Sequence, residues 1–159
     1  LSNAQRPAAR WDYTTGDLGL HVSADNPGAT TGDEAYGIAV TYSAGDISFG
    51  IGHEDNGAAD HTVASVTAGF GDATVKVAYG TADIAGADFD QMGVSLDYVS
   101  GATTLTAFWI EKELAGVAAD ALGVGVAYDL GGGASLKAGY VDADGDDDGR
   151  YDMGISMSF

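Results

Sequence analysis

The sequence RYDMGISMSF, residues 150–159, carries a large apolar side chain at every second position from Tyr151 onward. The residues between them are small or polar, and a period of two places the two sets on opposite faces of a β-strand. In a water-soluble sheet the apolar face would need a second layer to cover it. In a membrane barrel the apolar set would face lipid and the small set would face the lumen.

Composition limits the class of protein. The chain has 159 residues, 24 acidic and 6 basic, for a net charge of −18. It lacks cysteine, which removes disulfides and thiol chemistry, and its 25 glycines against 2 prolines fit short strands and tight turns. No apolar run approaches the roughly 20 residues of a membrane-spanning helix. The acidic balance argues against nucleic acid and anionic membrane surfaces as partners.

The same alternation recurs along the chain and predicts eleven strands. They are Ala8–Tyr13, Leu18–Ala24, Tyr36–Ser43, Ile47–Gly52, Thr62–Phe70, Thr74–Tyr79, Gln91–Val99, Thr103–Ile110, Ala121–Tyr128, Ala134–Val141 and Arg150–Phe159. Short turns and longer loops alternate between them, as the periplasmic turns and outer loops of outer-membrane barrels do. The sequence therefore predicts an all-β antiparallel transmembrane barrel, with odd-numbered strands running toward the periplasm.

Aromatic residues mark both ends of the outward faces. The set expected at the periplasmic end is Tyr13, Tyr42, Phe70, Tyr98, Tyr128 and Phe159, and the set at the outer end is Tyr36, Tyr79, Trp109, Tyr140 and Tyr151. The seven to nine residues of a strand reach roughly 20–27 Å, comparable to the apolar band of such barrels. Acidic residues fall in or beside the long loops, and mid-strand outward positions are uncharged. We interpret the two sets as aromatic girdles at the two lipid interfaces.

With its terminal apolar strand and its succession of hairpins, the chain resembles the C-terminal part of a Gram-negative general porin of the alphaproteobacterial type. The resemblance implies a sixteen-stranded outer-membrane barrel in contact with lipid, assembled as a homotrimer. It also implies passive diffusion of ions and small hydrophilic solutes, with no catalysis. We treat residues 1–159 as one porin domain, incomplete at its N-terminus because single-chain barrels have an even strand count. The small outward residues Ala64, Ala68 and Ala107 are candidates for the trimer contact.

Five basic residues are predicted to line the pore: Arg6, Arg10, Lys76, Lys137 and Arg150. Alternation points the last four inward. The resemblance implies a basic wall opposite an acidic constriction loop, with Arg6 and Arg10 best placed for that wall. Inward basic groups facing acidic loops would create a transverse field that orients dipolar solutes. The alternative is that the two lysines pair with Asp97, Asp129 or Asp152 in a polar lumen.

One acidic loop has the spacing of a calcium site. Asp142, Asp144, Asp146 and Asp148 alternate, which suits a cation that prefers six to eight oxygen ligands. Asp147 stands where the EF-hand pattern requires glycine, so a solvated acidic loop is the alternative. No other cofactor is expected, because His53 and His61 lack a third nitrogen or sulfur ligand and no catalytic motif is present.

Two other functions remain open from the sequence. A secreted, acidic, calcium-binding β-domain of adhesin type would fold in water without detergent and would depend on Ca²⁺. A small closed barrel serving as a membrane anchor or enzyme would fill its interior with bulky side chains. The predicted inward set is Gly, Ser, Thr and Ala, with Phe108 an exception. Small inward residues leave room for water, which favours a channel.

Overall fold

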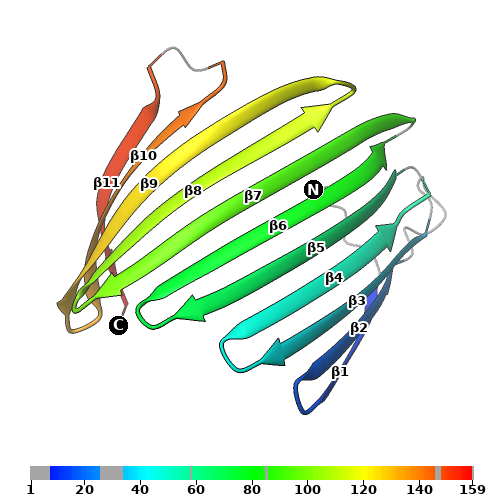
Figure 1. Ribbon diagram of the computed structural model, residues 1–159, viewed down its shortest axis with the longest axis horizontal. Helices are drawn as coiled ribbons and strands as arrows, with labels where there is room; N and C mark the ends of the chain where they lie inside the picture. Colours follow the sequence, from blue (N-terminus) through cyan, green and yellow to red (C-terminus); the bar gives the residue numbers. More distant parts are fainter. Residues whose placement is uncertain (1–7, 26–33, 58, 85, 146–147, 159) are drawn as a thin grey trace.

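The computed structural model describes residues 8–25, 34–57, 59–84, 86–145 and 148–158, which form one curved antiparallel sheet (Figure 1). Its eleven strands follow one another in chain order, which confirms the predicted number and arrangement. The strands are β1 (Ala8–Thr15), β2 (Leu18–Asp25), β3 (Ala35–Ala44), β4 (Ile47–Asp55), β5 (Ala59–Phe70), β6 (Ala73–Ile84), β7 (Ala87–Ser100), β8 (Thr103–Leu114), β9 (Val117–Gly131), β10 (Ala134–Ala143) and β11 (Arg150–Met157).

Neighbouring strands of the chain are neighbours in the sheet, and β1 and β11 form its two edges. Figure 1 shows the sheet as a single curved wall with these strands at opposite sides. The described residues contain no helix that is long and apolar enough to cross a membrane.

At one end of the sheet, tight turns join the two strands of each hairpin. The turn after β1 and the turn after β3 start with Gly16 and Gly45, at φ of 55° and 59°, where a side chain would be strained. The carbonyl of the residue that follows accepts a hydrogen bond from the next hairpin. Ser43 N donates to Asp17 O at 2.9 Å, and Gly69 N donates to Asp46 O at 2.8 Å. Backbone pairing therefore continues from hairpin to hairpin along this rim.

The expected alternation of short and long connections is wrong at the other end. The stretches 81–90 and 111–120, expected as loops, are mostly strand, because β6 continues to Ile84, β8 to Leu114 and β9 begins at Val117. Polar residues there keep the two-residue alternation and pair across strands, as Asp60 does with Asp83. Acidic composition was therefore a poor marker of loops, because the strands extend beyond the apolar band.

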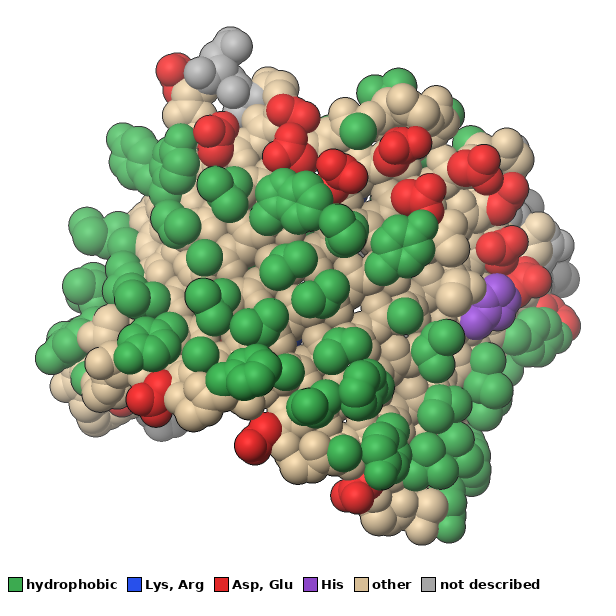
Figure 2. All heavy atoms as spheres, viewed as in Figure 1, with side chains coloured by type: hydrophobic (Ala, Val, Ile, Leu, Met, Phe, Trp, Pro, Cys, Tyr) green, Lys and Arg blue, Asp and Glu red, His purple; other side chains and the backbone are tan. Residues whose placement is uncertain are grey.

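The pairing register gives the sheet two chemically different faces. Arg10, Ser23, Gly37, Glu54 and His61 follow one another across β1–β5 and lie on what we call the polar face. Glycine, serine, threonine and alanine dominate this face along the remaining strands. The opposite face, which we call the apolar face, carries Val, Ile, Leu and aromatic side chains, as Figure 2 shows.

No other described part of the chain covers the apolar face. Ile51 is 57% exposed and Met153 is 77% exposed, and Ala82 is the single buried apolar residue among those the structure describes. A water-soluble protein would bury much of this surface. The sheet therefore has the surface of a lipid-facing wall, in agreement with the interpretation of residues 150–159.

Gly123 on β9 lies under an aromatic ring. A Cβ atom at this position would collide with the ring of Phe108 on β8, its cross-strand partner. The contacting atoms are the far end of the Phe108 ring, which would have to leave its preferred rotamer, so we expect Gly123→Ala to lower the free energy of unfolding by about 0.5–1.5 kcal/mol. Gly125→Ala is the matched control, because its nearest neighbour is Ala138 O at 3.6 Å. Urea titration of both variants in detergent tests this, and equal losses would contradict it.

Candidate functional site

The polar face holds the basic residues of the described strands. The register places Arg10, Lys76, Lys137 and Arg150 on this face, as the alternation predicts, and adds Lys112, which pairs in register with Gln91. Arg6 lies outside the described residues. Carboxylates share the face, since Asp12 and Glu54 lie in the same rows as these cations. The wall is thus mixed in charge rather than purely basic.

Arg10 belongs to a network on β1 and β2. Its Nε atom donates to both carboxylate oxygens of Asp12, at 2.8 and 3.0 Å. Oδ1 of the same carboxylate also lies 2.5 Å from Nδ1 of His21, and Nε2 of His21 lies 3.4 Å from Thr41 Oγ1. Asp12 therefore orients the guanidinium, whose terminal N–H groups are further donors on the polar face.

A second charged group lies on β6–β8. Lys76 Nζ is 3.9 Å from Asp97 Oδ2, and Thr106 Oγ1 donates to Asp97 Oδ1 at 2.6 Å. This is the lysine–aspartate pairing considered as the alternative role of Lys76. Lys137 lies between Ala127 and Gly154 in register and makes no ion pair within the described part of the chain.

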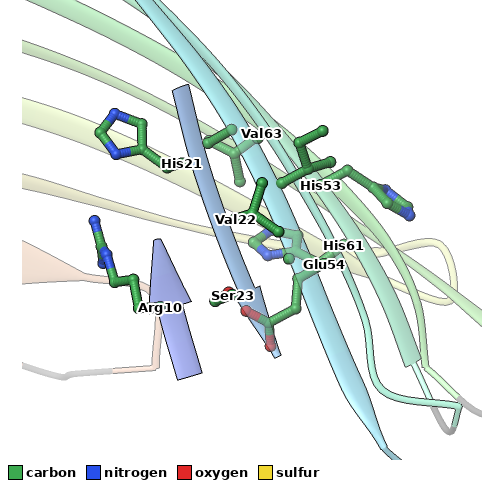
Figure 3. A pocket seen from close by; sticks show the side chains of 12 residues that line it. Arg10, His21, Val22, Ser23, His53, Glu54, His61 and Val63 are labelled. Carbon is green, nitrogen blue, oxygen red and sulfur yellow. The ribbon is translucent and has the colours of Figure 1, made fainter. Parts of the chain in front are cut away.

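A hollow of about 330 Å³ opens on the polar face between β1 and β5, and we call it the β1–β5 hollow. Gly37, Ala39 and Gly52 form its floor, because they leave little side chain above the sheet. Its sides carry Arg10, His21 and Ser23 at one end and Glu54, His61 and Val63 at the other (Figure 3). His53 points to the opposite side of the sheet, where it contacts Thr62 Oγ1 at 2.8 Å.

Sequence reasoning missed four polar-face residues: Asp12, Glu54, His61 and Lys112. Glu54, His61 and Lys112 were assigned to loops or loop borders that prove to be strands. Asp12 sits two residues after Arg10, and this shared parity was a usable signal. Continuing the two-residue alternation through the acidic stretches would have found the others.

The predicted girdle residues of the described strands all have the outward parity of the apolar face, and Phe159 lies outside the described residues. Three at the outer end donate hydrogen bonds to carboxylates. Tyr36 donates to Glu34, Tyr79 donates to Asp90 at 2.6 Å, and Trp109 donates to Asp120 at 3.2 Å. In Figure 2 acidic side chains gather along this edge above the apolar surface. Rings with a polar tip at such a border are typical of a membrane interface.

The predicted calcium loop is only partly described. Asp142 lies on β10, Asp144 Oδ2 accepts a hydrogen bond from Asp120 N at 3.1 Å, and Asp148 follows, whereas Asp146 lies outside the described residues. Among the residues described, no group of three or more His, Cys, Asp or Glu side chains is arranged to hold a metal ion. The calcium site stays a prediction.

Comparison with known proteins identifies the family to which the chain belongs. The model of the Gram-negative porin family matches residues 2–148. The chain belongs to the Gram-negative porin family. This membership places it in the bacterial outer membrane, in contact with lipid, and confirms the porin resemblance.

Individual porins agree in sequence and in fold. A porin of Rhodobacter capsulatus is 27% identical, and the match covers 100% of this chain and 64% of the relative. A porin structure refined at 1.8 Å has a TM-score of 0.86 at 24% identity, covering 97% of this chain and 62% of that one. A triple mutant of Rhodopseudomonas blastica porin has a TM-score of 0.73 at 23% identity, covering 96% and 55%. The chain thus spans less than two thirds of the length of these porins.

Proposed function

We propose that the complete protein forms a water-filled channel for passive diffusion of ions and small hydrophilic solutes. The observation that carries this proposal is the division of the sheet into two faces. Its apolar face is bordered by aromatic residues, and its polar face combines small residues with charged ones. Small side chains on a concave face leave space for water, whereas a closed, filled barrel would need bulky ones.

The proposed barrel needs more strands than the sheet contains. The outward edges of β1 and β11 would leave backbone N–H and C=O groups unpaired in lipid, where each costs several kcal/mol. We therefore propose that further strands of the complete protein pair with both edges and close the barrel. Residues 1–159 would then be one part of a single porin domain.

We further propose that the complete protein catalyses no reaction and assembles as a homotrimer. Ala64, Ala68 and Ala107 have the parity of the apolar face, and their small size permits close approach of a second copy. Electrophoresis of unheated samples tests the assembly. A band at three times the mass of the heated protein supports a trimer, and a monomer band in every mild detergent contradicts it.

The adhesin alternative loses its main support. A soluble domain of that kind would bury its apolar side chains away from water. On the apolar face, however, Tyr151 is 87% exposed and Met153 is 77% exposed. The family match agrees with a channel rather than with a secreted binding domain. The weak Ca²⁺ site in the loop between β10 and β11 stays part of the proposal, and thermal melting with and without Ca²⁺ tests it.

Single-channel recording of the refolded complete protein in planar bilayers tests the proposed function. We expect stepwise conductance with a preference for cations near 10 mM salt, because the chain carries a net charge of −18. The preference should weaken near 1 M, where the screening length falls from about 30 Å to about 3 Å. A water-soluble protein that inserts into no bilayer would contradict the proposal.

A further inference from the structure

We propose that the β1–β5 hollow binds zwitterionic solutes that carry a carboxylate and an ammonium group several ångströms apart, such as dipeptides. This inference rests on the proposed channel function, because it places the hollow on the wall of the lumen. It adds a class of solute and the residues that would bind it.

The two charged groups of the hollow lie in one row of the sheet. Arg10 pairs in register with Ser23, Ser23 with Gly37, and Gly37 with Glu54. One cationic and one anionic side chain therefore face the same hollow, separated by a hydroxyl and a glycine. A solute lying along this row would cross β2 and β3 above residues that offer little obstruction.

The spacing of this row suits a dipeptide. Strands lie about 4.8 Å apart, so three steps put the Arg10 and Glu54 backbones about 14 Å apart. Side chains stand roughly perpendicular to a sheet, so the charged groups of Arg10 and Glu54 keep a separation of this order, and a hydrogen bond of about 2.9 Å at each end leaves roughly 8 Å for the solute. An extended dipeptide spans about 7 Å between its terminal groups. A free α-amino acid is too short to reach both ends at once.

The Arg10 end and the Glu54 end of the hollow can each still bind a charged group of a solute. Arg10 uses its Nε–H for Asp12, and its side chain is 67% exposed, so its terminal N–H groups can grip a carboxylate. Asp12 acts as a positioning residue, held in turn by His21. At the other end, the exposed Glu54 carboxylate makes no hydrogen bond or ion pair within the described part of the chain.

The mixed charge favours zwitterions over simple ions. A simple anion attracted by Arg10 would also meet Asp12 and Glu54, and a simple cation attracted by Glu54 would meet Arg10. A solute with both charges satisfies both ends without an unpaired charge. His61 borders the Glu54 end, and its Nε2 atom is 3.3 Å from the side-chain nitrogen of Gln91.

Block of single-channel current by glycylglycine at low salt tests this site in the complete protein. We expect a concentration-dependent block that weakens by about tenfold or more in Arg10→Gln and in Glu54→Gln, since each removes one charge-assisted contact. Block by N-acetyl-glycylglycine, an anion, should weaken only in Arg10→Gln, and block by glycylglycine amide, a cation, should weaken only in Glu54→Gln. Lys137→Gln removes the same charge as Arg10→Gln and is its matched control, because Lys137 lies on β10, and it should change the block by less than about twofold.

The outcomes separate this inference from the proposed function. Conductance steps of the expected kind, with no block by glycylglycine or with an equal loss in Lys137→Gln, overturn the dipeptide site and leave the channel intact. Absence of conductance steps overturns the channel and the site with it. Loss of block in both hollow variants, with the control unaffected, supports the site.

Discussion

Val77→Arg destabilises the protein folded in a bilayer by about 2–4 kcal/mol, the cost of an arginine facing lipid at the midplane. Val77 on β6 is 41% exposed on the apolar face, between Val66 and Val94 in register. It lies between the two girdles, because Tyr79 follows it by two residues on β6 and Ala73, four residues before it, pairs in register with Phe70. Urea-dependent folding of the complete protein into vesicles measures the change.

Ala78→Arg is the matched control for this effect. Ala78 is the next residue on β6, it lies on the polar face beside Ser65 and Gly93, and an arginine there would extend into water. The control should lose less than about 1 kcal/mol, in the range of surface substitutions. Equal losses for the two variants would show that both faces are buried in the same way and would contradict the lipid-facing assignment.

Ser95→Pro prevents folding or lowers stability by several kcal/mol. Ser95 lies in the middle of β7 and pairs with Lys76 on one side and Phe108 on the other, so proline removes a ladder donor in an interior strand. In lipid no water replaces that partner. Ser95→Ala removes the same hydroxyl but keeps the N–H and should stay within about 1 kcal/mol of the parent.

Heat-modifiable electrophoretic mobility reports whether each of these variants folds. Folded mobility of Ser95→Pro equal to that of Ser95→Ala would mean that β7 is not held between β6 and β8 in the membrane. Such a result would contradict the strand order of the sheet as well as its interior position.

The fold was predictable from sequence because each face of a membrane strand carries its own kind of residue, apolar on one face and small or polar on the other. Val94 and Leu96 alternate with Ser95 and Asp97, and this period fixes which face meets lipid without any knowledge of the neighbouring strands. The turns were equally clear, because Gly16 and Gly45 interrupt the alternation where the backbone needs positive φ. These are local properties, which a single sequence records directly.

The outer ends of the strands were less predictable. Asp83, Asp88 and Glu113 are typical of loops, yet they lie on β6, β7 and β8. The hydrogen bonds of neighbouring strands hold these residues in the ladder, and β-propensity alone does not register that context. The strands are extended by pairing with their neighbours, and they therefore end later than their composition predicts.

The site was predictable residue by residue but not as an arrangement. Parity gave the face of Arg10, but the row that joins it to Glu54 depends on three successive strand registers. Registers are set by turn lengths and by pairing along whole strands. The sequence could therefore indicate a polar wall, and the structure was needed to bring an arginine and a glutamate to one hollow.

Single-cysteine scanning across β7 is the most direct test of the central claim, that this sheet separates lipid from a water-filled lumen. Residues 1–159 contain no cysteine, so each substitution adds one reporter to this part of the protein. In the complete protein in vesicles, cysteines at Gly93, Ser95 and Asp97 should react with a charged, membrane-impermeant thiol reagent. Cysteines at Val94 and Leu96 should resist it, and fluorophores there should be quenched by brominated lipid. Uniform reaction along the strand, or the opposite alternation, would contradict the account.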